Sequence, residues 1–520
     1  AVEGRVAGVA SHVNSVSPFV LECFKDFLKE LTPKRPLHPV DDDVVRANQP
    51  APSQQRILDD ADDCSALQWT MMNFIKAEIY GKVTEPRMIS TIKGEAKRRY
   101  SAYMYAYTAW LKSVNVGDVE KRVPWYAFCQ PPREVAERVA TICTENNVVI
   151  ETDANRMDGT ISELVRFFER MFLLAVYHPD HHAEIIDLHR EQYGAKCTVQ
   201  HLGDEQNVKY YMEWARASGS PETSWFNTFM KAFCMYLAKR FEIKSPGLSA
   251  HMRAWASLGM YGGDDGITGW IDPACIKRAA AALGLNIEMN YSARPGAGGS
   301  DLHSQMAALG LERENKHGRV KFLARVFGPD VWTGDPTSCC DIPRMLSKLH
   351  VTRASTTFTN RQALYAKALG LLFTDMNTPL VGALAAAIFI AAQVNEGPMG
   401  GGMMPSDTIL YVDRDKNRGA DSFLLSLGIS MRCDEEGAFV KEDVNEYIAG
   451  LREMCKQGLI SWWAEPDPEL AFPNNYDSNV NGWVGQYLDD NDLPDESFPD
   501  VKTWIMEGLF AADIYTGRRV

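Results

Sequence analysis

Carboxylate side chains gather at two places that lie far apart in the sequence. Asp153 directly follows a short apolar stretch rich in β-branched residues, at positions 148–152, and Asp158 comes five residues later. A second pair, Asp264 and Asp265, stands between two glycines. Glycine on both sides allows a metal ion or a phosphate group to approach the backbone closely. Both pairs are therefore candidates for binding a cation.

The reaction that such acids suit best is phosphoryl transfer assisted by two metal ions. Two divalent ions, roughly 3.5 to 4 Å apart, stabilise the attacking and the leaving oxygen, and carboxylates from separate strands bridge them. Mg²⁺ prefers carboxylate oxygens and substrate phosphates, and Mn²⁺ can substitute for it. Asp153 and Asp264 could supply these ligands. Each motif alone has a plainer interpretation, since the Gly-Asp-Asp-Gly segment could be a solvated turn and Asp153 a strand end at the surface.

A glycine-containing loop between these two places is predicted to lead into a helix. Residues 218–223 read Ser-Gly-Ser-Pro-Glu-Thr, and Ser220 followed by Pro221 is typical of a helix N-cap and first helical residue. Thr223 and Asn227 would then lie on one helix face. Hydroxyl and amide groups there could bind a ribose hydroxyl, although an ordinary capped helix explains the same pattern.

The elements that must position these residues are a mixture of strands and helices. The β-branched stretch at 148–152 predicts a buried strand, and the Gly-Asp-Asp-Gly segment predicts a tight turn between two further strands. Helices are predicted at 134–145 and, from the spacing of apolar residues, from 161 onward. Residues 65–112 show helical patterns alternating with a basic stretch, and the chain is predicted to be mostly helical after about 327.

The composition is that of a large folded protein with a negative net charge. The 520 residues are 45% hydrophobic, and the formal net charge is -14. Positive charge that could hold a polyanion is therefore local, and residues 76–99 carry seven Lys and Arg against three Glu. Residues 457–501 carry ten carboxylates and no Lys or Arg, and we expect them to face away from nucleic acid.

Several other features bear on the class of protein. Residues 1–60, broken by the prolines at 33, 36, 39, 50 and 52, are predicted to form an irregular layer over another domain. Eleven cysteines without a C-x-x-C pair indicate a reducing, intracellular setting rather than a disulfide framework. No targeting peptide is recognised at the N-terminus. The apolar run at 380–394 is shorter than the roughly twenty residues that span a bilayer, which favours a buried helix.

The order of the three motifs makes the interpretation specific. Asp153-x4-Asp158, then Ser218-Gly219-x3-Thr223-x3-Asn227, then Gly263-Asp264-Asp265 resembles the blocks called A, B and C of positive-strand RNA virus polymerases. Within that group the chain is similar to the replicases of nodaviruses and their relatives, over roughly residues 50 to 380. The similarity also rests on residues 150–153, 157–159, 322–327 and 349–352.

The resemblance implies roles for the residues of these blocks. Asp153 and Asp264 would hold two Mg²⁺ ions, with Asp265 as a supporting ligand, and these three acids would be catalytic. Ribose selection would fall to four further residues, namely Asp158, Ser218, Thr223 and Asn227.

Two further blocks are implied by the same resemblance. The basic stretch resembles block F, so Lys76, Lys82 and Arg87 would contact the triphosphate of the incoming nucleotide. Residues 322–327 resemble block E, so Phe322 and Arg325 would support the 3' end of the nascent strand. The alternating apolar residues at 322–327 are explained equally well by an ordinary strand of the hydrophobic core. Any single lysine of the basic stretch could equally belong to a solvent-exposed helix face.

The chain departs from the family in block D. Residues 284–290 lack the lysine that many such polymerases place there to protonate the leaving pyrophosphate. Arg294 or Lys316 could stand in, although the high pKa of arginine makes it a poor proton donor, so the general acid stays open. A histidine-rich cluster matches no standard zinc spacing and is predicted to be a surface helix end, comprising His178, Asp180, His181, His182 and His189.

The resemblance implies an α+β right-hand polymerase with a small antiparallel palm sheet flanked by helices and an α-rich thumb. The expected parts are an N-terminal cover (1–60), fingers (61–147 and 161–212), palm (148–160 and 213–326) and a thumb with an acidic C-terminal segment (327–520). Expected partners are an RNA template, nascent RNA, nucleoside triphosphates and other replicase copies, with no membrane span in this chain. The expected location is the host cytoplasm, at intracellular membranes through a region outside this chain.

Two alternatives remain at this stage. A reverse transcriptase shares the palm and the metals, but Asp158 paired with Asn227 argues against it, because a bulky residue is expected where deoxynucleotides must be preferred. A non-catalytic RNA-binding replication scaffold with a polymerase shape is the alternative from another class. The presence of all the metal-binding carboxylates argues against that one.

Overall fold

The computed structural model describes most of the first two thirds of the chain. The described ranges are 2–49, 70–76, 84–92, 94–116, 123–128, 132–199, 208–243, 247–297, 299–314 and 317–347, with isolated positions between 55 and 61, at 130, and between 367 and 385. The chain divides into two compact units, one formed by residues 1–130 and 141–316 and the other by residues 131–140 and 317–520.

A five-stranded sheet carries both carboxylate motifs within the first unit. Its order is β6-β7-β3-β8-β9, with β3 (Val148–Ala154) in the centre. This strand pairs antiparallel with β7 (Asp265–Gly269) and β8 (Ile287–Ala293), which are flanked by β6 (Met260–Gly262) and β9 (Glu312–Arg313). Strands were therefore correctly predicted at both motifs.

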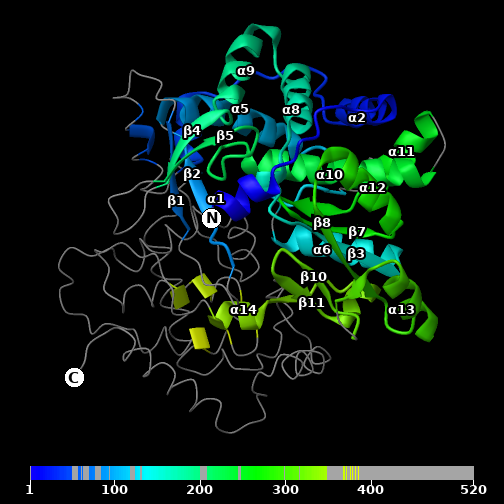
Figure 1. The fold of residues 1–520 in the computed structure, drawn as a ribbon. Helices are drawn as coiled ribbons and strands as arrows, with labels where there is room; N and C mark the ends of the chain where they lie inside the picture. Colours follow the sequence, from blue (N-terminus) through cyan, green and yellow to red (C-terminus); the bar gives the residue numbers. More distant parts are fainter. Residues whose placement is uncertain are drawn as a thin grey trace, which may run out of the picture. The chain divides into compact units, whose positions relative to one another are not determined.

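Helices cover one side of this sheet. The long helix α10 (Thr223–Ile243) packs against α12 (Pro273–Leu283) and α11 (Leu248–Ala256), and α10 and α12 lie together along the sheet in Figure 1. Helix α12 is delimited as its sequence predicts: Asp272 caps it through the N–H of Ala274, and Gly284 ends it at a φ of 73°. The apolar side chains of α10 are almost all buried, so this helix forms part of the hydrophobic core against the sheet.

A second sheet lies in the same unit, in the order β2-β1-β4-β5. It consists of β1 (Thr70–Ile75), β2 (Met88–Thr91), β4 (Ala195–Val199) and β5 (Val208–Met212). The helical patterns predicted within 65–112 are thus wrong at β1, and among the described residues of that stretch α5 (Gly94–Leu111) is the helix. Helices α7 (Met157–Thr160), α8 (Glu163–Val176), η2 (Pro179–His181) and α9 (His182–Arg190) connect the two sheets along the chain.

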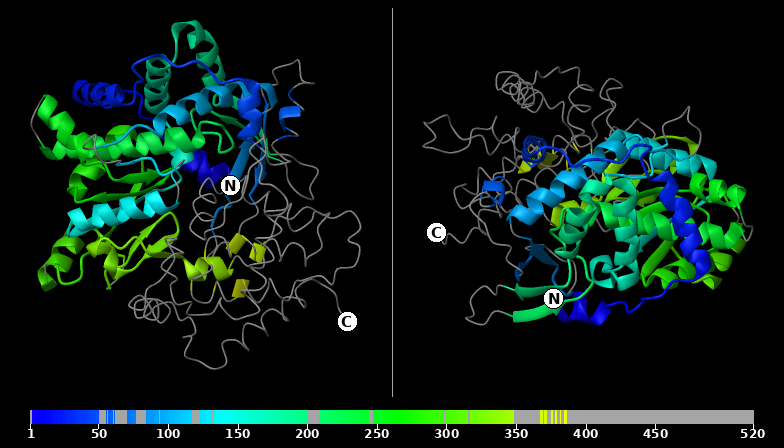
Figure 2. Two further views of the ribbon diagram at one scale, coloured as in Figure 1. Left: turned by 180° about the vertical axis from the view of Figure 1, so that it is seen from behind. Right: turned by 90° about the horizontal axis from the view of Figure 1, so that it is seen from above.

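The N-terminal segment is more regular than its prolines suggested. It contains α1 (Val2–Arg5), η1 (Ala7–Val9), α2 (Pro18–Glu30) and α3 (Asp42–Ala47). Ser17 caps α2 by accepting a hydrogen bond from the N–H of Val20. Phe24 of α2 packs edge-to-face, and Phe27 at a tilted angle, against aromatic rings of α10, and Figure 2 shows α2 beside α10 and α11. The segment therefore packs on α10 through a regular amphipathic helix, α2.

The described part of the second unit holds a three-stranded antiparallel sheet. It comprises β10 (Val320–Phe322), β11 (Arg325–Phe327) and β12 (Ser338–Cys340), with η3 (Pro329–Thr333) and α14 (Ile342–Ser347). Leu323 and Ala324 turn the hairpin with φ values of 48° and 60°. Helix α6 (Pro132–Glu145) is divided between the two units, and α13 (Gly299–Ala308) belongs to the first.

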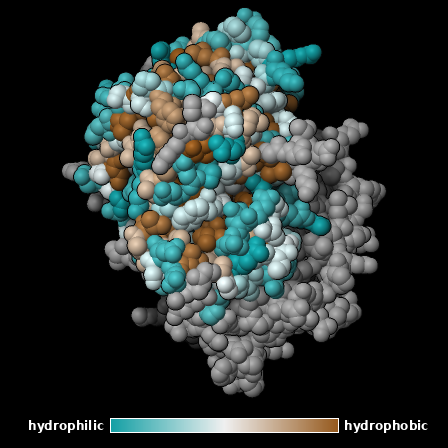
Figure 3. Space-filling model, turned by 90° about the vertical axis from the view of Figure 1, so that its right-hand side faces the viewer, coloured by the Kyte–Doolittle hydropathy of each residue, from teal (hydrophilic) through white to brown (hydrophobic). Residues whose placement is uncertain are grey.

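Predictions for the C-terminal third fall mostly outside the described residues. They concern the apolar run at 380–394, the acidic segment at 457–501 and the helical character after 348. Among the described residues, no helix is both long and apolar enough to cross a bilayer. On the face drawn in Figure 3, hydrophobic residues are interspersed with hydrophilic ones.

Candidate active site

Strand pairing brings the two carboxylate motifs together. Asp153, near the end of β3, stands opposite Asp265 of β7 in the antiparallel register, and the N–H of Ala154 donates to the backbone oxygen of Asp264 at 2.9 Å. Gly263 has a φ of 69°, and its N–H donates to the hydroxyl of Thr228 on α10 at 2.7 Å. The predicted tight turn therefore holds Asp264 beside the end of β3.

A buried lysine, which sequence reasoning missed, lies against this turn. Lys231 Nζ donates to the backbone oxygen of Asp264 at 2.9 Å. Burial lowers the pKa of Lys231 to about 8, while the charges of Asp153 and Asp264 oppose that shift. Lys231 follows Asn227 by one helical turn, so its place on the inner face of α10 could have been read from the spacing.

The carboxylates fit a divalent metal. Desolvation, and then the negative charge of Asp264, raise the pKa of Asp153. A carboxylate whose charged form is disfavoured in this way gains from a cation bound beside it. Asp153, Asp264 and Asp265 offer hard oxygen ligands, which is the donor set that Mg²⁺ prefers.

Asp153 and Asp264 line a pocket of about 640 Å³, which is within the size range of small-molecule sites. Asp153, Asp158 and Asp264 contribute negative charge to its lining. Its positively charged lining residues are Arg5, Lys76, Arg87, Arg156 and Arg216. The lining thus combines groups that could bind metal ions with groups that could bind phosphates.

The residues predicted to select ribose meet in the same pocket. Asn227 Nδ2 donates to Asp158 Oδ1 at 2.8 Å, and Ser218 and Thr223 line the wall beside them. Burial raises the pKa of Asp158, although its bond from Asn227 opposes the shift. Gly219 lies against β2, where an added Cβ would come within 2.1 Å of the backbone oxygen of Ser90, so only glycine fits.

The helix that carries Thr223 and Asn227 begins later than predicted. Helix α10 starts at Thr223, and the carbonyl of Glu222 accepts the N–H of Phe226. Ser220 is thus not the N-cap. Its hydroxyl accepts the N–H of Glu222 and donates to Gln192, because residues 220–222 form a turn that precedes the helix.

The described side chains of the basic stretch at 76–99 lie in different surroundings and do not form one positive surface. Lys76 and Arg87 line the pocket and are joined through the Lys76 N–H and the Arg87 carbonyl at 2.8 Å. Arg98 and Arg99, by contrast, form ion pairs with Asp42 and Glu184. Lys82 lies outside the described residues. Arg156, which sequence reasoning missed, adds a pocket cation from a left-handed position with a φ of 53°.

The remaining predicted site residues lie elsewhere. Phe322 is buried in the hairpin of the second unit, and Arg325 binds Asp375 and Ser338 there. Arg294 donates to the carbonyls of Cys143 and Thr144 at the end of α6, so it caps a helix. Lys316, the other stand-in for the missing block D lysine, lies outside the described residues.

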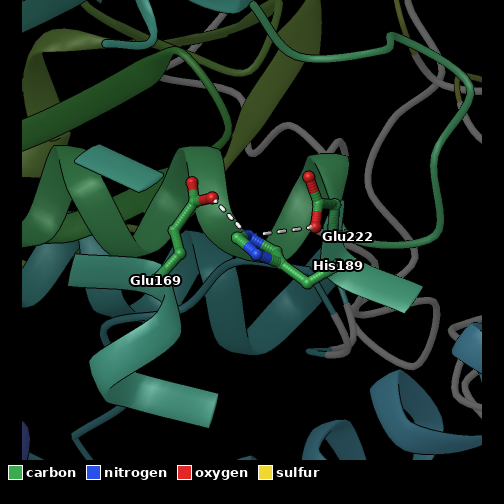
Figure 4. A group of neighbouring side chains, drawn as sticks. All are labelled: Glu169, His189 and Glu222. Carbon is green, nitrogen blue, oxygen red and sulfur yellow. Dashed lines mark hydrogen bonds and ion pairs between the residues drawn. The ribbon is translucent and has the colours of Figure 1, made fainter. Parts of the chain in front are cut away.

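One member of the histidine-rich cluster is not at the surface. His189 is fully buried, and its Nε2 lies 2.9 Å from Glu169 and 3.9 Å from Glu222, as Figure 4 shows. Arg166 and Arg216 form ion pairs with the same two glutamates. Because two guanidinium groups already balance the two carboxylates, these residues form a charged structural cluster and do not suit a metal ion.

Viral polymerases of known structure share the fold described above. The fold is that of viral RNA-dependent RNA polymerases: a human picobirnavirus enzyme of known structure matches 85% of this chain and 80% of its own, with a TM-score of 0.55 at 10% sequence identity. A second structure of that enzyme, an insertion-loop deletion mutant, matches with a TM-score of 0.54 at 11% identity. The predicted α+β polymerase architecture is thereby confirmed.

In sequence, the chain is similar to nodavirus RNA-directed RNA polymerases. The polymerase of Atlantic halibut nervous necrosis virus is 29% identical over 392 residues, which are 73% of this chain and 35% of the relative. That of Pariacoto virus is 28% identical over 396 residues, or 74% and 36% of the two chains. The chain thus spans about a third of the length of these relatives. No protein-family model matches it. The nodavirus resemblance expected from the motifs is confirmed.

Proposed function

We propose that this chain is the catalytic core of a viral RNA-directed RNA polymerase that replicates and transcribes a positive-strand RNA genome. The observation that carries the proposal is that Asp153 and Asp264, brought together by strand pairing at the turn that also carries Asp265, line one pocket with the Asp158–Asn227 pair. The RNA 3'-oxygen forms a bond to the α-phosphorus of a nucleoside triphosphate, and pyrophosphate leaves. The names of the nodavirus relatives describe the same activity.

The carboxylates of the pocket would bind the metals of this reaction. Asp153 and Asp264 would hold two Mg²⁺ ions, or Mn²⁺ in their place, with Asp265 in support. Such ions stabilise the charge that develops on the attacking and leaving oxygens. The backbone bond between Ala154 and Asp264 keeps the two acids in place before any ligand arrives.

The other pocket residues would hold the nucleotide. Lys76 and Arg87, together with Lys82, would bind the triphosphate, since charge-assisted hydrogen bonds to phosphate are strong. Asp158 and Asn227 would recognise the ribose 2'-hydroxyl, which can both donate and accept. Ser218 and Thr223 would position that pair, and Phe322 with Arg325 would support the nascent 3' end.

The proposed enzyme has the domains, partners and cellular location that the resemblance implies. The cover would be residues 1–60, the fingers 61–147 and 161–212, the palm 148–160 and 213–326, and the thumb 327–520. An RNA template, nascent RNA and other replicase copies would be partners. The enzyme would act in the host cytoplasm, attached to intracellular membranes through a region outside this chain.

A template-directed extension assay tests the proposal. Asp264→Asn is expected to reduce Mg²⁺-dependent ribonucleotide incorporation by at least about a thousandfold, because the metals contribute several kcal/mol to the transition state. Asp301→Asn, at an exposed position of α13, is the matched control and should extend like the wild type. Equal extension by the wild type and Asp264→Asn would refute the assignment of the site.

The same assay separates the two alternatives. Preference for deoxynucleotides over ribonucleotides would indicate a reverse transcriptase. RNA binding by the folded chain without any incorporation would indicate a scaffold. The hydrogen bond between Asn227 and Asp158 favours the ribonucleotide enzyme, because this pair offers polar groups where a deoxynucleotide enzyme needs a bulky side chain.

A further inference from the structure

Arg216 lies directly behind the pair that would read the ribose. Its Nε donates to Asn227 Oδ1 at 2.6 Å, and its backbone N–H donates to the carbonyl of Asp158 at 2.8 Å. Asn227 in turn donates from Nδ2 to Asp158 Oδ1. Arg216 therefore contacts both members of the pair, from the residue just ahead of the Ala217-Ser218-Gly219 loop.

The bond from Arg216 determines which way the Asn227 amide faces. An asparagine side chain has an accepting end and a donating end, whereas a guanidinium group can only donate. With Oδ1 bound to Arg216, the amide NH₂ must point to Asp158. A flipped amide would set its oxygen against the carboxylate of Asp158 and its NH₂ against the guanidinium, and both contacts would be unfavourable.

Arg216 itself is held rigidly. Its side chain is buried, and its NH1 and NH2 form ion pairs with Glu222 and Glu169. Glu169, His189 and Glu222, drawn in Figure 4, come from separate parts of the chain. Arg166 completes the cluster by binding the same two glutamates and the carbonyls of residues 214 and 215. The guanidinium group thus has one available position, from which Nε faces Asn227.

We propose that Arg216 is a specificity-determining positioning residue, which fixes the amide of Asn227 so that the pocket distinguishes ribose from deoxyribose. The inference rests on the proposed polymerase function. Arg216 acts through Asn227. The feature of Arg216 that matters is the donor at Nε, whereas the charge at the end of the guanidinium group serves the buried cluster.

Two substitutions separate the donor from the charge. In Arg216→Lys the side chain has a methylene group in place of Nε but keeps a positive charge for Glu169 and Glu222. In Arg216→Gln the side-chain amide places an N–H donor on the same carbon that carries Nε in arginine, but the charge is lost. The matched control is Arg166→Lys, because Arg166 binds the same two glutamates and does not touch Asn227.

The measurement is kcat/KM for a ribonucleoside triphosphate divided by that for its 2'-deoxy analogue. We expect this ratio to fall about tenfold in Arg216→Lys, the effect of one hydrogen bond. Arg216→Gln and Arg166→Lys should keep the wild-type ratio, although both are expected to be less stable in urea unfolding.

Three results would overturn the inference. These are a wild-type ratio in Arg216→Lys, an equal fall in Arg166→Lys, or an equal fall in Arg216→Gln. If Arg216→Lys does not fold, the ratio in Arg216→Gln decides, since a fall there contradicts the role of the donor. A wild-type chain that incorporates no ribonucleotide would instead contradict the proposed function.

Discussion

Lys231 places a buried positive charge behind the carboxylates of the candidate active site. Its ammonium group is bonded to the backbone of Asp264 and is near Asp153, whose charge opposes the effect of burial on the pKa of the lysine. In the absence of a metal ion, this charge offsets part of the repulsion between the acids. The same charge must oppose the binding of a divalent cation.

Removal of this charge is therefore expected to strengthen metal binding. In Lys231→Met the dissociation constant for Mn²⁺ should fall about tenfold, which corresponds to ~1.4 kcal/mol of relieved repulsion. Titration of Mn²⁺ followed by electron paramagnetic resonance measures it without any turnover. Lys239→Met, on the same helix and paired with Glu242, is the control and should bind Mn²⁺ like the wild type. Unchanged or weaker binding by Lys231→Met would show that the lysine does not sense the metal site.

The order of the three sequence motifs predicted correctly which of their residues lie together in the fold. Asp158 and Asn227 are joined by a hydrogen bond, and strand pairing brings Asp153 to the Asp264 turn. Lys231 and Arg216 were missed because their roles depend on which side chains meet them after folding. A lysine within the otherwise apolar run of residues 229–238 was nevertheless a signal, since burying an ammonium group requires a compensating partner.

At the scale of elements, a buried charged cluster links helices α8 and α9 to the start of α10 through ion pairs, in addition to apolar packing. Glu169 belongs to α8 and His189 to α9, and Glu222 directly precedes α10. Tyr100 of α5 donates to Glu222 at 2.7 Å. The cluster thus fixes four elements to one another beside the loop that begins the ribose site.

This cluster should make the stability of the chain depend on pH. Burial alone would raise the pKa of Glu169, but the charges of Arg166 and Arg216 hold it well below its usual value of 4.5. A carboxyl group with a lowered pKa stabilises the fold above its unfolded pKa and loses that effect as the pH falls. Glu169→Gln should therefore cost about 3 kcal/mol at pH 7, and the difference from the wild type should shrink below about pH 4.5.

Urea unfolding at several pH values between 7 and about 2.5, a range that extends well below the unfolded pKa of glutamate, measures this difference. Glu163→Gln, in the exposed first turn of the same helix, is the control and should leave the free energy of unfolding nearly unchanged at each pH. A cost of Glu169→Gln that stayed constant as the pH fell would contradict the ion-pair explanation.

The elements that sequence reasoning misjudged are those whose partners are distant in the chain. β1 and β2 lie in a stretch interpreted as helical, yet β1 pairs in parallel with β4 and buries its edge there. Such a pairing leaves no local periodicity to read. Helix α2 was overlooked because prolines surround it, although Ser17 and Pro18 are a typical helix start.

At the scale of the molecule, positive charge is concentrated where a polyanion would bind. The chain carries a net charge of -14, yet four Arg and Lys side chains line the described pocket besides the buried Arg216, whose charge is balanced by Glu169 and Glu222. Negative charge elsewhere would repel nucleic acid from other surfaces and leave the pocket as the favoured entry. Composition predicted that the positive charge must be local, but not that Arg5 and Arg156 would supply part of it.

This concentration of positive charge would make the affinity of the pocket for nucleotides decrease as the salt concentration rises. Arg87→Ala should raise the KM for a nucleoside triphosphate about tenfold, because a charge-assisted hydrogen bond to phosphate is lost. The rise of KM between 50 and 200 mM salt, over which the Debye length falls about twofold, should also become less steep. Lys196→Ala, at an exposed position of β4 outside the pocket lining, is the control for loss of one surface charge. If Lys196→Ala changed the salt dependence as much as Arg87→Ala, net charge rather than the pocket would govern binding.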